Sequence, residues 1–162
     1  VRALRKEDSN ARLAHLAYLH TMSPPTQVKP EPGIFLEFAP IYRSHAHPLR
    51  QTDAVGRGEI PHGKTLEYLD ANLDAFPRET AQALEYWLDA SMFSEWARPA
   101  KRLPWNPDVF HSDLETYAKG GIRHITTFAA WVDGDYVRRF GQPEFVKEYG
   151  DIFQAYGREV GK

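Results

Sequence analysis

Residues 41–50, IYRSHAHPLR, combine histidines and arginines, which can bind metals, anions or sugars. His45 and His47 form a His-x-His pair; on an extended segment both imidazoles point to one face, where a carboxylate could complete a zinc site. Arg43 could instead hold a substrate carboxylate through two parallel hydrogen bonds. A solvated loop is the third interpretation. The segment alone leaves all three open.

Two carboxylates follow predicted strands, Asp89 and Asp133. Glycoside hydrolysis requires a pair of carboxyl groups, one protonated and one ionised, so these two are the predicted catalytic residues. Turn chemistry is the alternative for Asp133, which begins an Asp-Gly-Asp run. The predicted substrate contacts also follow strands: Tyr18, His20, Arg43, His47, Trp131 and Tyr136.

The elements that must position these residues alternate between strands and helices. Apolar, β-branched and aromatic runs predict strands over 12–20, 34–41 and 122–132, and residues 83–93 are read as a strand in preference to a helix, which their spacing also suits. Helical spacing of apolar residues predicts helices over 64–76, 106–120 and 143–156. Between them lie a proline-rich connector, a long loop over 42–62 and a turn at 133–136.

This order predicts an α/β fold of parallel (β/α) units in a single domain over residues 1–162. Binding sites in such folds form at the carboxyl ends of the strands, where the polar and aromatic candidates collect. Half of a TIM (β/α)8 barrel is the favoured architecture, and a small open sheet is the alternative. We therefore expect the chain to be a fragment of a larger barrel.

The composition limits the classes of molecule that could be partners, but it does not indicate the cellular compartment. The net charge is -2 with interspersed signs, which argues against nucleic acid, and no apolar run approaches membrane-spanning length. The chain has no cysteine, so disulfides and thiol catalysis are excluded. Neither a metal nor another cofactor is expected.

Three segments suggest a family: LAHLAYLHTMSPPTQVKPEPGIFLEFAPIYRSHAHPL, LEYWLDASMF and DLETYAKGGIRHITTFAAWVDGDY. They resemble the C-terminal part of the bacterial family called domain of unknown function 4838. The resemblance implies the C-terminal half of a glycoside-hydrolase-like (β/α)8 barrel. It includes Tyr18, Arg43 and His47, whereas His45 lies outside the family pattern. His45 is accordingly expected to be incidental.

The favoured function is a carbohydrate-active, glycoside-hydrolase-like barrel segment that contributes substrate-binding loops. The alternatives are a non-catalytic carbohydrate- or protein-binding module and a metal-dependent hydrolase that uses His45 and His47. An open parallel edge would favour a homo-oligomer or association with the missing half of the barrel. Replacing Arg43 by alanine is expected to weaken binding of an acidic glycan.

Overall fold

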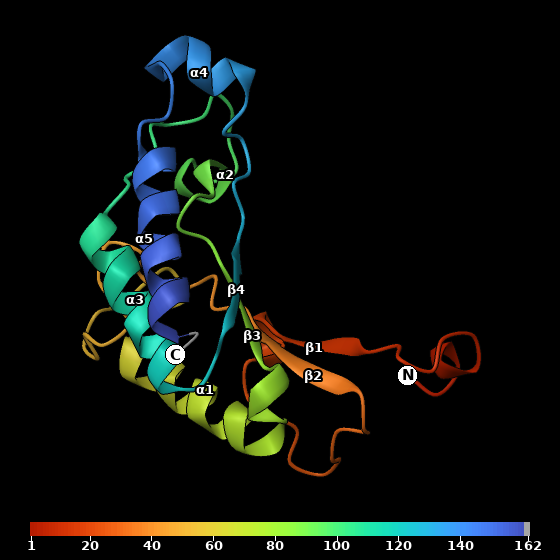
Figure 1. Ribbon diagram of the computed structural model, residues 1–162. Coiled ribbons are helices and arrows are strands. Elements are labelled where there is room, and N and C mark those ends of the chain that lie inside the picture. The colour runs from red at the N-terminus through yellow and green to blue at the C-terminus, as the bar shows by residue number, and fades with distance from the viewer. Residues whose placement is uncertain (161–162) are drawn as a thin grey trace.

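The computed structural model describes residues 1–160, which form an α/β protein built on one sheet. The four strands are all parallel, and each pairs with the next strand in sequence (Figure 1). They are β1 (Leu13–Ala17), β2 (Ile34–Phe38), β3 (Gln82–Glu85) and β4 (His124–Thr127). The predicted α/β class with parallel strands is therefore confirmed.

Helices occupy most of the segments between and after these strands. The predicted helices over 64–76, 106–120 and 143–156 are confirmed, with ends shifted by a few residues. The α-helices are α1 (His62–Ala75), α2 (Ala90–Phe93), α3 (Pro107–Lys119), α4 (Gly134–Phe140) and α5 (Phe145–Val160). Short 3₁₀ helices are η1 (Leu4–Lys6), η2 (Leu19–Thr21) and η3 (Arg78–Thr80).

Two predicted elements are wrong, and both errors involve an aspartate that begins a helix. Residues 83–93 were expected to form one strand, but β3 ends at Glu85 and Asp89 caps α2. Residues 133–136 were expected to form a turn, but Asp133 caps α4. In each case the carboxylate accepts hydrogen bonds from the N–H groups two and three residues ahead, which favours a helix start.

The long helices cover one face of the sheet (Figure 1). Leu36 and Phe38 of β2 are fully buried on that face and pack in one cluster with residues of α1, α3 and α5. Strand register places Ala17 beside Phe38, and Phe38 beside Ala83, in the same buried row. This alternation of buried and more exposed residues sets which strand side chains face the helices.

The opposite face of the sheet is largely open. Leu16 is 40% exposed there and Phe128, just beyond β4, is 45% exposed. Among residues 1–160, α2 and the segment after β2 pack only near the carboxyl end of this face. Because all-parallel sheets are normally covered on both faces, this exposed surface is a feature that the function must explain.

The last helix docks through one side. Phe145 is partly buried beside Trp105, with ring centroids 6.0 Å apart, whereas Val146 is 52% exposed. We expect Phe145→Ala to lower the free energy of unfolding by about 1 to 2 kcal/mol, the scale of partial aromatic burial. Val146→Ala is the matched control and should change it by less than about 0.5 kcal/mol. Urea denaturation checks both, and equal effects would show that Phe145 does not anchor α5.

Candidate functional site

A buried cluster of charged residues lies under the carboxyl end of β3. Glu85, the last residue of β3, points toward the helices and meets Arg43 from the segment after β2. Arg43 Nε lies 3.0 Å from Glu85 Oε1, and Arg43 Nη2 lies 2.6 Å from Asp113 Oδ2 on α3. All three side chains are 0% exposed. The cluster therefore ties β2, β3 and α3 together through one arginine.

Neutral groups complete the hydrogen bonding of both carboxylates. Glu85 accepts hydrogen bonds from the Tyr117 hydroxyl and the backbone N–H of Tyr86. Asp113 accepts from Trp87 Nε1 at 2.9 Å and from the Leu49 N–H at 2.7 Å. Such complete pairing is what allows charges to remain buried in a protein interior.

The guanidinium of Arg43 thus has its carboxylate partners inside the protein. Its third nitrogen donates to the Ser44 carbonyl at 3.1 Å, and the side chain does not reach solvent. The sequence prediction placed Arg43 against a substrate carboxylate, and the structure instead places it against Glu85 and Asp113. We conclude that Arg43 has a structural role, in which it holds the buried cluster together.

One cation facing two carboxylates separates their pKa values. Burial would raise the pKa of Glu85, but Arg43 and the hydrogen bond from His45 lower it to about 2. Burial raises the pKa of Asp113 despite the attraction of Arg43. Burial would lower the pKa of Arg43, yet the two carboxylates raise it. Glu85 is therefore ionised at neutral pH.

His45 belongs to this cluster. Its Nε2 lies 3.3 Å from Glu85 Oε2, and its side chain is 2% exposed. Burial, followed by repulsion from Arg43, lowers the pKa of His45 to about 4, so the imidazole is neutral at pH 7. Because ionised Glu85 can only accept, the neutral ring carries its proton on Nε2 and leaves Nδ1 as an acceptor. His45 is therefore a structural member of the buried cluster, and the expectation that it has no part in substrate contacts stays a prediction.

His47 lies at the surface, so the two histidines do not share one site. Within residues 1–160, no group of three or more histidine, aspartate or glutamate side chains is arranged to hold a metal ion. The His-x-His spacing indicated a shared face, which requires an extended backbone. The turns between residues 41 and 50 send the two rings in different directions instead.

An open groove runs over His45 between the loop after β2 and the loop after β3. Val55 and Arg57 line one side, and Phe93 and Glu95 line the other. Arg57 and Glu95 approach to 4.0 Å across it. Gly56 permits this path, because a Cβ there would collide with the backbone of Tyr42. Arg43 and His45 of the buried cluster also line this groove.

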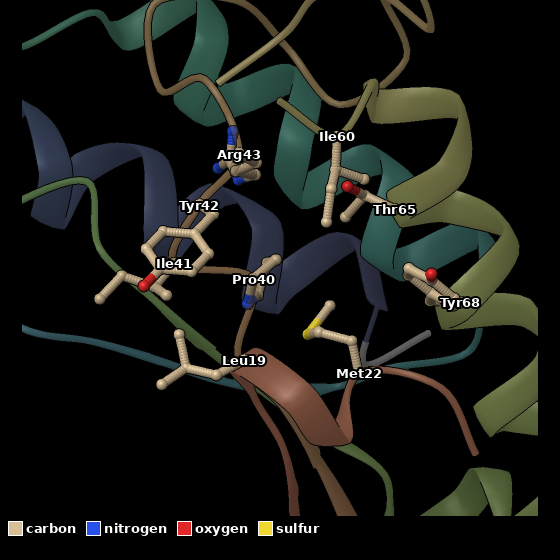
Figure 2. A pocket seen from close by; sticks show the side chains of 9 residues that line it. All are labelled: Leu19, Met22, Pro40, Ile41, Tyr42, Arg43, Ile60, Thr65 and Tyr68. Atoms are coloured by element: carbon tan, nitrogen blue, oxygen red, sulfur yellow. The ribbon is translucent and has the colours of Figure 1, made fainter. Parts of the chain in front are cut away.

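Figure 2 shows a smaller pocket on the other side of this segment. It has a volume of about 30 Å3, room for roughly one water. Met22, Tyr68 and Pro40 are among its mostly apolar lining residues. Arg43 also lines it, but the guanidinium nitrogens pair with Glu85, Asp113 and the Ser44 carbonyl. The side chains around this pocket pack the Arg43 segment against α1. The pocket is too small to be a substrate site.

The other predicted site residues are scattered over the carboxyl end of the sheet. Tyr18 precedes η2 and is partly buried, while His20 is exposed. Tyr136 is 2% exposed, and its hydroxyl accepts a hydrogen bond from the Leu103 N–H. Trp131 is partly buried under Arg98. These residues lie near one end of the fold but do not converge on the groove.

Asp89 and Asp133 cap different helices and share no hydrogen bond within the described residues. Asp89 is 6% exposed, and its Oδ1 also accepts from the Ser91 hydroxyl. Asp133 is exposed and pairs with Arg98 at 2.8 Å, which lowers the pKa of Asp133. An ionised carboxylate suits the base or nucleophile of a catalytic pair, and not the acid. Their predicted catalytic roles stay predictions.

Backbone strain gathers in the loops that follow strands. Among residues 1–160, the non-glycine residues with left-handed φ all come after a strand end: Leu19, Glu59, Glu95, Trp96 and Trp131. In contrast, glycine takes the left-handed positions that precede strands, at Gly33 and Gly121. Non-glycine residues in this region cost about 1 to 3 kcal/mol and cluster at functional sites. The strained non-glycine positions therefore lie in the loops where the predicted site residues also lie.

The sequence prediction missed Glu85, Asp113 and Tyr117. One signal was present for Asp113: it interrupts the apolar stripe of α3 between Phe110 and Leu114, where a charge needs a buried partner. No comparable signal marked Glu85, because a short strand gives too few positions to establish which face is buried. Its partners also come from segments distant in sequence.

The fold and site together define an α/β protein with a parallel sheet and a polar, strained carboxyl end. No protein-family model, curated protein or solved structure matches the chain. No helix within residues 1–160 is long and apolar enough to cross a membrane.

Proposed function

We propose that the chain is part of a glycoside-hydrolase-like (β/α)8 barrel, as the family resemblance implies. Strand order β1-β2-β3-β4 supports this, because each strand of a barrel pairs with the next, whereas a doubly wound sheet reverses its order. The helices covering one face suit a barrel exterior. The open face and the free edges of β1 and β4 would then meet further parallel strands.

We further propose that the groove beside His45 binds carbohydrate. The observation that carries this is an aromatic platform at the rim: Trp96 is 53% exposed, stands in a strained left-handed conformation and carries Arg57 over one ring face. Exposed aromatic rings offer flat apolar surfaces to the C–H faces of sugars. Polar groups in the adjacent groove can meet the hydroxyls.

The first test is the affinity of the chain for oligosaccharides of different composition. We expect Trp96→Ala to weaken binding at least about fivefold, the loss of about 1 kcal/mol that separates contributing from neutral contacts. Val28→Ala is the control, because Val28 is 71% exposed in the connector that precedes β2. Isothermal titration calorimetry measures both variants.

An unchanged affinity in Trp96→Ala would show that the Trp96 ring does not contact the bound sugar. Absence of any oligosaccharide binding, with peptide binding at the same groove, would favour the protein-binding module instead. Glycoside hydrolysis is tested separately by product analysis with Asp89→Asn and Asp133→Asn. Activity that survives both substitutions would show that neither carboxylate is catalytic.

A further inference from the structure

Two loops at the carboxyl end carry the same arrangement of three side chains. In the first, the Arg57 guanidinium lies 4.8 Å from the Trp96 ring centroid and 4.0 Å from Glu95. In the second, the Arg98 guanidinium lies 4.3 Å from the Trp131 ring centroid and pairs with Asp133 at 2.8 Å. We call each set a tryptophan-arginine clamp.

The clamps link successive loops in a regular way. Arg57 comes from the loop after β2 and stacks on a tryptophan after β3. Arg98 comes from the loop after β3 and stacks on a tryptophan after β4. Both tryptophans have positive φ, 54° for Trp96 and 62° for Trp131. The same backbone conformation thus recurs at neighbouring strand ends, with Trp96 53% exposed and Trp131 partly buried.

Packing between the loops explains why each arginine stacks on a tryptophan. It does not explain why the arginines and their paired carboxylates are exposed. The arginine side chains are 41% and 46% exposed, and the carboxylates that pair with them are 62% and 43% exposed. Ion pairs this exposed contribute about 0 to 1 kcal/mol, so they hold the arginines only weakly. An incoming anion can replace the protein carboxylate and form a bidentate contact.

We propose that the two clamps are subsites for an acidic oligosaccharide, each placing a sugar against a tryptophan and its carboxylate against the arginine. This rests on the proposed carbohydrate function and names its substrate class. The stacked arginine is pre-oriented, which reduces the ordering that binding requires. The recurrence of the clamp calls for a ligand with at least two anionic units.

The test compares an oligosaccharide of four uronic acid residues with its carboxyl-reduced, neutral counterpart. We expect the unmodified chain to bind the acidic probe at least tenfold more tightly, measured by calorimetry at low salt. Arg57→Gln and Arg98→Gln should each lower this ratio about threefold or more. Arg78→Gln is the control, because Arg78 is also ion-paired and 52% exposed but lies in η3, ahead of β3.

The ratio between probes separates charge recognition from a loop-packing role, which would alter both affinities alike. Equal binding of the two probes, still weakened by Trp96→Ala, would overturn the acidic class and leave the proposed carbohydrate function standing. A loss of preference in only one arginine variant would overturn the two-subsite arrangement. If neither probe binds, the acidic class is overturned, and the oligosaccharides of other composition decide the carbohydrate function separately. Circular dichroism of each variant confirms that it is folded.

Discussion

Arg43→Ala is expected to lower the free energy of unfolding by about 3 to 5 kcal/mol, the cost of removing one partner from a buried ion pair. Without the guanidinium, Glu85 and Asp113 would remain in the interior as two carboxylates with no cation between them. The loss is large because neither side chain has access to water that could solvate its charge.

Urea denaturation at pH 7 measures this loss, with Arg78→Ala as the control. Arg78 forms a 2.6 Å pair with Asp74, but both side chains are more than half exposed, so its removal should cost about 0 to 1 kcal/mol. Arg43→Lys keeps the charge and should fall between the two, because an ammonium cannot reproduce the two-sided contact. A loss below 1 kcal/mol in Arg43→Ala would contradict the central role of the cluster.

Acidification from pH 7 to pH 4 is expected to destabilise the fold, with His45 contributing about 3 kcal/mol once it is fully titrated. Its pKa falls from 6.5 to about 4 on folding, so the unfolded chain binds more protons in that window. Stability from His45 is thus present above pH 6.5 and lost as the pH falls toward 4. The lowered pKa of His62 acts in the same direction.

The two carboxylates act in opposite senses, Glu85 below pH 4.5 and Asp113 above its ordinary pKa of 3.8. The pKa of Glu85 falls from 4.5 to about 2, so its stabilisation is lost as the pH drops through that range. The raised pKa of Asp113 has the reverse effect, since the folded state holds that proton more tightly. Urea midpoints at pH 7, 5.5 and 4.5 should fall less steeply in His45→Gln than in the unmodified chain. Parallel curves would show that His45 does not titrate in this window.

The local elements were predictable because short-range physics determines them. Pro107 follows the Asn106 cap, and Asn106 accepts hydrogen bonds from two N–H groups at the start of α3. The spacing of apolar residues likewise predicted α1 and α5. The two wrong elements arose where a capping aspartate begins a short helix, once in place of a predicted strand end and once in place of a predicted turn.

The site was less predictable because its contacts join residues far apart in the chain. Arg43 was singled out by type and position as a substrate contact, but its partners in the fold are 42 and 70 residues away. His45 and His47 differ by two positions, and only the path of the loop decides that one is buried and the other exposed. No periodicity in so short a segment carries that information.

By itself, the sequence determined the α/β class, the main helices and the concentration of polar and aromatic residues after strand ends. These follow from hydrophobic spacing and capping, which act over a few residues. The tertiary structure alone decided that Arg43 faces Glu85 and Asp113, that His45 joins them, and that Arg57 and Arg98 stack on tryptophans. Burial and ion pairing depend on which distant segments meet, and that is settled only when the chain packs.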